Sequence, residues 1–366
     1  MKSPIKICII SLDSYPLFNP NVPQTFGGAE VQFFLLSQSL VKDQNFEISF
    51  IVGDYEQKEN IEERTGILLY KRLNSFGLPF LRLMKKVGAD IYISSGSGRT
   101  VGKWAFFAWL LGKKFIYMVA SDIDCNGDFE RQSSFFGALW YRLGLRFANM
   151  IVAQNNYQKD LLNKRGYNNI LIMKKILEDL SENFLEKQNS YILWVGRCEE
   201  WKRPEIFIEL AQKFIREKFK MICSPVKDNP SFFNKIHSLA DNVSNLSFSS
   251  REKYDKMDNI YKKAKIIVTT SDFEGDLPIV ILESLKYGTP VLSLNVNPDN
   301  CFDKYKFGFF ARGDIKTLEK NLELLLGDKI LYNKCQIEGQ KYYKLTNDKE
   351  SIVKKYTELF NKIMKR

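Results

Sequence analysis

Apolar and polar positions alternate along the chain in a pattern typical of buried strands that are separated by half-buried helices. Short β-branched or aromatic runs predict parallel strands in the first half of the chain. Helical patterns lie between them, such as the three-and-four spacing of apolar residues at 30–41. The strands predicted in this half are residues 6–11, 48–52, 91–94, 115–119 and 150–153.

A second alternation of the same kind begins after a polar, acidic segment at 177–190, which we interpret as a linker. Two βα arrays of similar size predict two doubly wound α/β domains. The last segment has apolar residues along one helical face, so we expect it to dock on the first domain. The expected domains are therefore residues 1–186, 187–348 and 349–366. The second array predicts strands at 191–195, 220–223, 266–270 and 291–294, and helices at 205–218, 258–264, 280–287 and 317–326.

The composition agrees with two folded domains and argues against a nucleic-acid-binding or membrane-spanning protein. The chain has 366 residues, of which 45% are apolar and 14% aromatic, enough for two packed cores. Its net charge of +11 is spread evenly rather than concentrated in a run, so nucleic acid is not an expected partner. The longest apolar stretch, 104–111, is shorter than the roughly 20 residues that span a bilayer. The apolar run at 5–12 is too short for a signal peptide.

The cysteines and the histidine bear on location and on metal binding. Six cysteines lie far apart without a C-x-x-C pair, a pattern that favours reduced thiols and a cytoplasmic location. His237 is the only histidine and lies far from every cysteine along the chain. The sequence therefore predicts neither a zinc site nor a catalytic His–Asp relay.

Two glycines open the helix predicted at 30–41. Gly27 and Gly28 follow a long loop, 13–25, which contains three prolines. Glycines let a backbone approach an anion closely, and the first amides of a helix point at it. We interpret the pair as a candidate phosphate-binding turn and the loop as a candidate functional segment. A plain helix start made of permissive residues is the alternative.

Two cations follow the strand predicted at 191–195. Arg197 stands just beyond the strand, and Lys202 stands at the start of the next helix. Arg bridges two oxygens and Lys acts as a point charge, so a strand end with both cations suits a diphosphate. A solvated basic helix start is the alternative, which the intervening Glu199 and Glu200 favour slightly.

An acidic loop and a helix follow the strand predicted at 266–270. Glu274 lies in the loop, and Glu283 lies in the helix. A carboxylate accepts hydrogen bonds from two neighbouring hydroxyls, as a ribose or a sugar ring requires. The amides of Ile279 and Val280 would face a phosphate at the helix N-terminus. A surface position for Glu283 on an amphipathic helix is the alternative.

In this order and spacing, the motifs resemble those of the retaining glycosyltransferases of family 4, which have the GT-B fold. The resemblance covers nearly the whole chain. It implies two Rossmann-like domains that face each other across a cleft, with the acceptor on the first and a nucleotide-sugar on the second. It also implies a terminal helix that packs back on the first domain. The motifs that carry it are GGAE at 27–30, VGR-x4-K at 195–202, EG…P-x4-E at 274–283 and YGTPV at 287–291.

Position by position, the resemblance assigns roles to these residues. It places Arg197 and Lys202 on the donor diphosphate, where they would stabilise the leaving group. Glu274 matches the carboxylate that contacts the transferred sugar, and Glu283 matches the one that holds the ribose hydroxyls. The glycines at 27–28 match a loop near the donor phosphates and the acceptor. The resemblance also makes the loop at 13–25 the expected acceptor loop.

The chain departs from the family pattern at two places. Residues 275–282, between the two glutamates, are one more than usual, as if Asp276 were inserted. Asp276 is therefore a second candidate for the role of Glu274. Many relatives have a histidine where Ser121 stands, whereas the next residue, Asp122, is retained. We place Ser121 and Asp122 on the acceptor or sugar side.

Two other enzyme classes share parts of this pattern. The D-x-D triplet at 122–124 is also the metal signature of GT-A transferases, but two successive sheets disagree with that fold, so we expect no metal. A hydrolase with Glu274 and Glu283 as acid and base is the nearest competitor. The cations beside these carboxylates suit anion binding better than water activation.

Aromatic and basic residues interleave at 131–147. This pattern is typical of an amphipathic helix that lies on an anionic membrane surface, and core packing is the alternative. The stripe consists of Phe135, Phe136, Leu139, Trp140, Leu143 and Phe147, with Arg131, Arg142 and Arg146 among them.

We therefore expect a metal-independent, retaining hexosyltransferase. It would move a sugar from a nucleotide-diphosphate donor to a glycan or lipid-linked acceptor, in the synthesis of cell-surface polysaccharide or glycoconjugate. It would use no cofactor, bind no nucleic acid, and act in the cytoplasm or peripherally on the inner face of the membrane. A degenerate GT-B protein that binds nucleotide-sugars without catalysis is the alternative.

Overall fold

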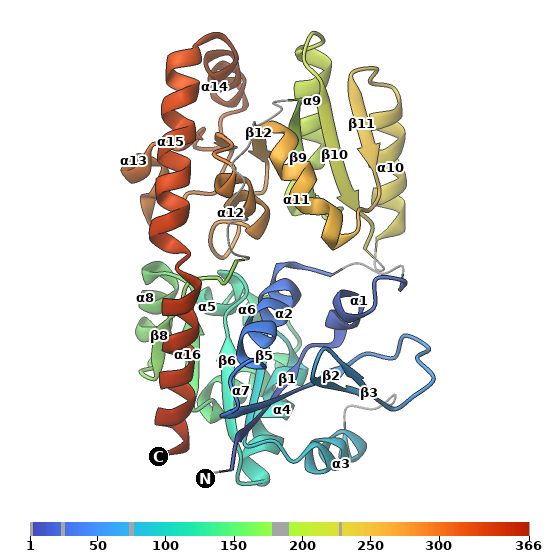
Figure 1. The fold of residues 1–366 in the computed structure, drawn as a ribbon, viewed down its shortest axis with the longest axis vertical. Helices are drawn as coiled ribbons and strands as arrows, with labels where there is room; N and C mark the ends of the chain where they lie inside the picture. Colours follow the sequence, from blue (N-terminus) through green and yellow to red (C-terminus); the bar gives the residue numbers. More distant parts are fainter. Residues whose placement is uncertain (1–2, 23–25, 73–76, 178–189, 227–228, 366) are drawn as a thin grey trace. The chain divides into compact units, whose positions relative to one another are not determined.

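The chain divides into two compact α/β units. The structure, a computed structural model, describes residues 3–22, 26–72, 77–177, 190–226 and 229–365. Unit 1 comprises Met1–Glu178 with Asp348–Arg366, and unit 2 comprises Asp179–Asn347. In each unit a largely parallel sheet lies between helices (Figure 1). The domain boundary predicted between residues 186 and 187, like most of the predicted linker, lies outside the described residues.

Unit 1 contains an eight-stranded sheet of order β3-β4-β2-β1-β5-β6-β7-β8. All neighbouring strands are parallel except the β3–β4 pair. The five strands predicted for this half are confirmed as β1, β2, β5, β6 and β7. The strands are β1 (Ile5–Ile10), β2 (Phe46–Val52), β3 (Ile61–Arg64), β4 (Ile67–Lys71), β5 (Ile91–Ser95), β6 (Lys114–Met118), β7 (Met150–Ala153) and β8 (Ile170–Ile172).

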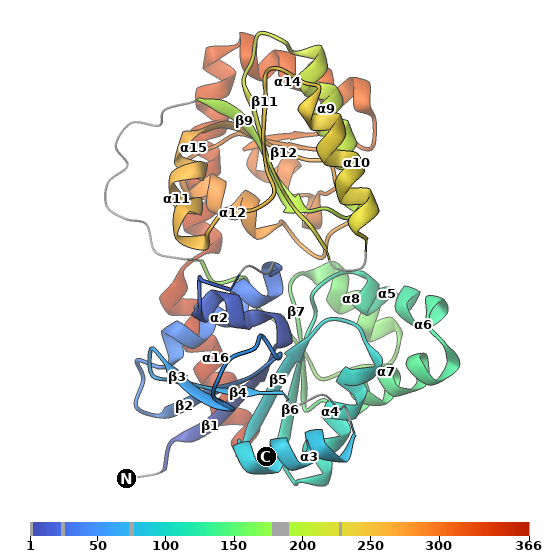
Figure 2. The ribbon, with the colours of Figure 1, turned by 90° about the vertical axis from the view of Figure 1, so that its right-hand side faces the viewer.

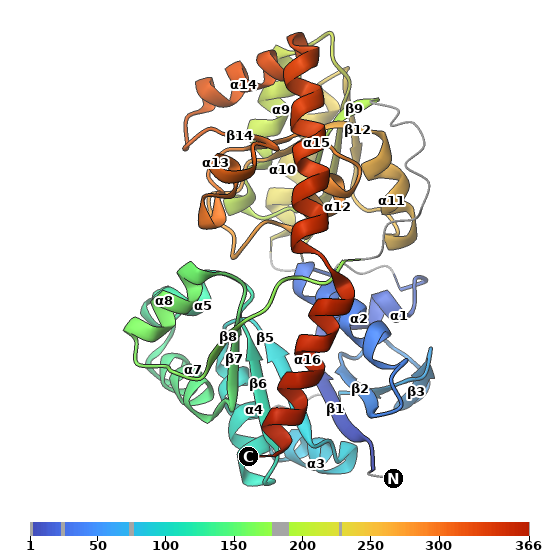
Figure 3. The ribbon, with the colours of Figure 1, turned by 60° about the vertical axis from the view of Figure 1, so that its left-hand side comes forward.

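Helices cover both faces of this sheet (Figures 2 and 3). On one face α3, α4 and α7 enclose a core that includes Tyr92 and Tyr117 of the sheet. On the other face α16 packs near α2, and Phe360 meets Phe46 edge-on with ring centroids 5.8 Å apart. The predicted return of the terminal helix to the first domain is thus confirmed. The helices of unit 1 are η1 (Leu12–Ser14), α1 (Tyr15–Phe18), α2 (Gly28–Leu40), α3 (Leu78–Val87), α4 (Arg99–Leu110), α5 (Ile123–Asn126), α6 (Asp128–Gln132), α7 (Phe135–Phe147), α8 (Asn156–Lys164) and α16 (Lys349–Met364).

Helices α4 and α7 cross at very short range because glycines meet at the crossing. A Cβ at Gly102 would lie 1.7 Å from the carbonyl oxygen of Trp140, and one at Gly144 would lie 2.6 Å from the Cα of Gly102. No side chain larger than hydrogen fits at either position. The two helices therefore form one rigid pair. None of the described helices has both the length and the apolar character that crossing a bilayer demands.

Unit 2 contains a six-stranded parallel sheet of order β11-β10-β9-β12-β13-β14. The four strands predicted here are confirmed as β9, β10, β12 and β13. The main core lies between the sheet and helices α9, α10 and α14. The strands are β9 (Tyr191–Arg197), β10 (Phe219–Ser224), β11 (Leu246–Ser249), β12 (Ala264–Thr269), β13 (Val291–Ser293) and β14 (Gly308–Phe310). The helices are η2 (Glu200–Lys202), α9 (Pro204–Lys213), α10 (Pro230–Asp241), α11 (Tyr254–Lys263), α12 (Ile279–Lys286), η3 (Pro298–Asn300), α13 (Cys301–Tyr305), α14 (Ile315–Gly327) and α15 (Lys329–Thr346).

Candidate functional site

In unit 2, the ends of β9 and β12 are joined by hydrogen bonds just where ligands bind in open parallel sheets. The indole Nε1 of Trp194, in β9, donates to Oγ1 of Thr270, which follows β12, at 3.0 Å. The same hydroxyl donates to the backbone oxygen of Lys202 at 2.7 Å. These bonds fix the loop after β9 against the loop after β12. The sequence-predicted Lys202 is thereby held at the sheet edge.

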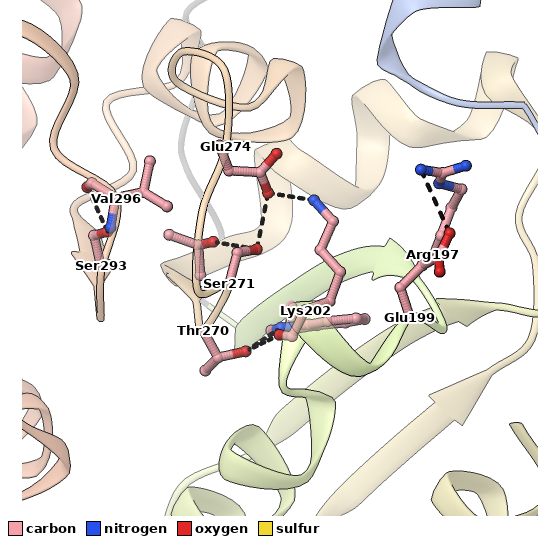
Figure 4. Close-up of polar contacts among 10 residues, drawn as sticks. Arg197, Glu199, Lys202, Thr270, Ser271, Glu274, Ser293 and Val296 are labelled. Carbon is pink, nitrogen blue, oxygen red and sulfur yellow. Dashed lines mark hydrogen bonds and ion pairs between the residues drawn. The ribbon is translucent and has the colours of Figure 1, made fainter. Parts of the chain in front are cut away.

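A nearly buried ion pair joins two of the predicted site residues. The Lys202 ammonium donates to Oε1 of Glu274, and their side chains are only 14% and 13% exposed (Figure 4). Ser271 donates its hydroxyl to the same carboxylate oxygen at 2.8 Å. The Lys202 ammonium also lies 4.3 Å from the ring centre of Trp201. Because water is largely excluded, this charge pair interacts more strongly than a surface pair would.

Arg197 supplies a second, accessible cation beside this pair. It is the last residue of β9, and its side chain is 45% exposed. Its guanidinium lies 3.5 Å from Glu199 and stands apart from the Lys202–Glu274 pair (Figure 4). Exposed pairs of this kind contribute about 0–1 kcal/mol, so Glu199 holds the guanidinium only weakly. Arg197 is therefore free to turn toward an incoming anion.

An aromatic stack braces the two loops that carry Lys202 and Glu274. The rings of Trp201 and Phe273 are stacked at 4.8 Å and 13°. The amide of Asp272 donates to the backbone oxygen of Trp201 at 2.8 Å. Sequence reasoning did not find these partners, because the stack joins residues that are distant along the chain. Their only signal is that each aromatic residue immediately precedes a predicted site residue.

The N-terminus of α12 offers backbone donors. Ile279 and Val280 are its first two residues, and the first intrahelical amide bond runs from Ile281 to Pro278 at 3.0 Å. The amides of Ile279 and Val280 thus precede the hydrogen-bonded ladder, as the first amides of a helix do. The helix dipole also favours an anion at this end. The sequence-based assignment of these two amides to a phosphate requires such a helix start.

The remaining carboxylates of the third motif differ in their surroundings. Glu283 is half-buried and faces Tyr261 of α11. Burial is the main cause that raises the pKa of Tyr261, and the charge of Glu283 and a hydrogen bond to it add to the effect. Glu283 is thus not a fully solvated surface residue. Asp276 is only 8% exposed, but the Lys202 ion pair and the Ser271 hydrogen bond both go to Glu274.

In unit 1, the predicted glycine turn is capped by the chain itself. Gly27 is the N-cap of α2, and its amide donates to Oε2 of Glu30 at 2.7 Å. A carboxylate therefore already lies at the helix end where we expect a phosphate. The predicted acceptor loop is partly helical, since Tyr15–Phe18 forms the buried helix α1. Residues 23–25 lie outside the described residues.

The loop that carries Ser121 and Asp122 is fixed by a buried carboxylate. Oδ2 of Asp124 accepts the amides of Ala120 and Ser121 at 2.7 and 3.1 Å. Burial raises the pKa of Asp124, and the two amides partly oppose this rise. Oδ1 of Asp122 accepts the side-chain amide of Gln158 at 3.1 Å. The D-x-D triplet thus uses both carboxylates within the protein. Across the described residues, no three His, Cys, Asp or Glu side chains gather as a metal site requires.

Comparison with known proteins identifies a family match and a similar fold. Residues 176–342 match the family model of glycosyl transferases group 1. An uncharacterized glycosyltransferase of Haemophilus influenzae is 24% identical over 200 residues, which cover 52% of this chain and 55% of the relative. The chain therefore spans about half the length of the curated relative it matches.

Two solved structures match nearly the whole chain. Sucrose-phosphate synthase from Thermosynechococcus elongatus aligns with a TM-score of 0.75 and 12% identity, covering 98% of this chain and 99% of its own. HepE from Anabaena, in complex with UDP and glucose, aligns with a TM-score of 0.75 and 14% identity, covering 98% and 100%. Identities this low show the fold alone. Residues 176–342 therefore match the glycosyl transferases group 1 family, and the chain as a whole has the GT-B fold of two Rossmann-like domains.

Proposed function

We propose that the protein is a metal-independent, retaining glycosyltransferase of family 4 that takes its sugar from a nucleotide-diphosphate donor. The observation that carries the proposal is the nearly buried Lys202–Glu274 pair at the ends of β9 and β12, with the exposed Arg197 beside it. The match of residues 176–342 to the family of glycosyl transferases group 1 supports it, and so does the likeness to HepE, which was solved with UDP and glucose.

The cations act on the charge that develops as the glycosidic bond breaks. Negative charge grows on the leaving diphosphate, and fixed donors lower the barrier only where they meet that growing charge. Lys202 supplies a point charge and Arg197 a two-pronged donor. The amides of Ile279 and Val280 donate to the diphosphate at the end of α12. With two cations and two amide donors stabilising the charge of the diphosphate, the reaction needs no divalent cation.

The carboxylates hold the neutral parts of the donor. When a diphosphate draws the Lys202 ammonium toward itself, Glu274 is released to accept hydrogen bonds from the transferred sugar. Glu283 accepts the two ribose hydroxyls. The donor phosphate takes the proton of the acceptor hydroxyl, which attacks on the face that the leaving group vacates, so configuration is retained.

The acceptor belongs to unit 1 in this proposal. Ser121 and Asp122 line its position together with the turn at Gly27 and Gly28. These groups are hydroxyl, carboxylate and backbone, which suit the hydroxyls of a glycan or of a lipid-linked sugar. The product class is a cell-surface polysaccharide or glycoconjugate, made on the cytoplasmic side.

Donor turnover tests the proposal directly. The full chain is incubated in EDTA with UDP-, GDP- and CDP-sugars, alone and with glycan or lipid-linked acceptors. Nucleotide release and the anomeric signal of the product are followed by NMR. Release from one donor class, with retention, is the expected result. Donor binding without any release would assign the chain to the degenerate, non-catalytic alternative.

A further inference from the structure

The helix pair α4 and α7 of unit 1 presents large apolar side chains to solvent. Phe135 and Phe136 are 77% and 64% exposed, and Trp109 is 57% exposed. Leu110 and Leu139 are also exposed. We call these five residues the docking face. Core packing, the alternative reading of the aromatic stripe at 131–147, does not account for side chains this exposed.

The partly buried members of the stripe form the base of this face. Phe106 of α4 packs against Trp109, Trp140 and Phe147, with ring centroids 5.7 to 5.9 Å apart. These contacts and the glycine crossing show that α4 and α7 run in the same direction. Trp109 and Leu110 therefore lie at one end of the pair, and Phe135 and Phe136 lie at the other. Packed aromatic side chains thus separate the two exposed apolar groups at the ends of the helix pair.

The charge of the two helices has one sign. Arg99 and Lys103 in α4, with Arg142 and Arg146 in α7, are their only charged residues, so neither helix contains Asp or Glu. The neighbouring α3 adds three more basic residues and no acidic one. The acidic residues just before α7 are already paired, Asp128 with Arg131, and Glu130 with Arg165 and, at 4.0 Å, with Arg142 of α7. The face is therefore both apolar and cationic.

We infer that the docking face binds the surface of an anionic lipid bilayer. Phe, Leu and Trp side chains enter the boundary between headgroups and acyl chains, and Arg and Lys stay among the anionic headgroups. The phosphates of a nucleic acid would pair with the cations, but the exposed phenylalanines and leucines would stay in water. This inference goes beyond the proposed function and stands independently of it, because lipid binding needs neither donor nor turnover.

Vesicle binding of the full chain tests the apolar part of the inference. The chain is sedimented with vesicles of phosphatidylcholine, alone or mixed with phosphatidylglycerol. The double variant Phe135→Ser, Phe136→Ser is expected to lose at least about tenfold in affinity for mixed vesicles, since it loses two inserted side chains. The matched control is Ile330→Ser, Ile337→Ser on α15, which removes two equally exposed apolar side chains from unit 2 and is expected to bind like wild type.

A second pair of variants tests the charge. Arg142→Gln, Arg146→Gln is expected to weaken binding roughly fivefold for each residue, and added salt is expected to weaken wild type in the same way. Lys329→Gln, Lys334→Gln on α15 removes the same charge from another exposed helix and serves as the control. Circular dichroism melts show that each variant is folded.

Three results would overturn the inference. They are the absence of wild-type binding to mixed vesicles, equal binding to vesicles without phosphatidylglycerol, and unchanged binding of the double phenylalanine variant. If the chain bound DNA or RNA through the same arginines and did not bind vesicles, the partner of this face would be a nucleic acid instead. Each of these experiments measures binding alone, so its result does not depend on whether the chain turns over a sugar donor.

Discussion

The two units place acidic side chains at the same end of similar sheets but use them differently. In unit 2, Glu274 pairs with Lys202, a cation that a ligand can take over. In unit 1, Glu30 caps the amide of Gly27, and Asp124 accepts the amides of Ala120 and Ser121. A carboxylate paired with a side-chain ammonium can change partners when an anion arrives, whereas one bonded to backbone amides is part of the fold.

This difference bears on which ligand each unit suits. An anion gains from the cations of unit 2 but meets the carboxylate of Glu30 at the corresponding helix end of unit 1. A neutral hydroxyl-bearing acceptor suffers no such repulsion. Both units contain a sheet of the same general kind, so the proposed division into a donor unit and an acceptor unit depends on the side chains that follow the strands.

Removal of the exchangeable cation should have the largest effect. Lys202→Ala removes a charge that would meet the leaving diphosphate and leaves Glu274 nearly buried without its partner. We expect nucleotide release from the donor to fall by roughly 10²–10³-fold. Lys213→Ala, which breaks an exposed pair with Glu319 in the same unit, should keep wild-type turnover. Equal rates for the two variants would remove Lys202 from the mechanism.

Neutralising the carboxylate should separate binding from turnover. Glu274→Gln keeps the shape of the side chain and frees the Lys202 ammonium. We expect transfer to fall about 10²-fold, in the range of a lost transition-state contact. Nucleoside-diphosphate affinity, measured by calorimetry, should stay constant or rise. Asp276→Asn is the matched control, and a larger loss in that variant would give Asp276 the sugar contact instead.

The buried carboxylate of unit 1 should affect stability rather than donor binding. Since burial raises the pKa of Asp124, the folded state keeps its proton to a higher pH than the unfolded state, whose value is near 3.8. The stability that this group contributes is present below that value and is lost as pH rises through the folded pKa. Asp124→Asn should flatten the dependence of stability on pH. At the acidic pH where wild type is most stable, it should lower the free energy of unfolding by about 1–2 kcal/mol.

Urea unfolding across acidic pH measures this effect for wild type and Asp124→Asn. The nucleotide affinity of the variant should equal that of wild type. Parallel pH profiles for the two proteins would show that Asp124 is not the group responsible for the slope.

The smallest effect should come from the helix cap. Glu30→Ala removes the acceptor of the Gly27 amide and a negative charge from the start of α2. We expect it to lower the free energy of unfolding by about 0.5–1 kcal/mol. Glu47→Ala, which breaks an exposed pair with Lys6, should cost less. A loss of several kcal/mol in Glu30→Ala would assign this carboxylate a wider role.

The buried centre of each sheet was predictable, and its margins were not. Strands such as β1 and β9 are apolar enough to be read directly. The short edge strand β3 reads IEER, so its pairing with β4 leaves no apolar signal. The long helix α15 was missed because its buried face consists of tyrosines, a cysteine and a glycine rather than aliphatic side chains. Helix α9 ends at Lys213, not at residue 218 as predicted, because Phe214 leaves the helical conformation (φ −100°, ψ 57°).

The candidate site was predictable as a set of residues but not as a set of contacts. Arg197, Lys202 and Glu274 follow predicted strands, so their positions were visible in the sequence. Their partners were not, because the Lys202–Glu274 pair and the Trp201–Phe273 stack join segments about 70 residues apart. The cap on Gly27 is local, yet Glu30 was read only as part of a motif and not as a competitor for the anion.

The central claim is that Lys202 binds a nucleoside diphosphate without metal. The most direct measurement is the thermal unfolding of wild type and Lys202→Ala in EDTA with UDP, GDP, CDP and their sugar conjugates. A ligand at 100 times its Kd stabilises the folded state by about 2.7 kcal/mol. We expect one nucleotide class to raise the melting temperature of wild type, with a much smaller shift in the variant. No shift with any nucleotide, or equal shifts in both proteins, would contradict the account.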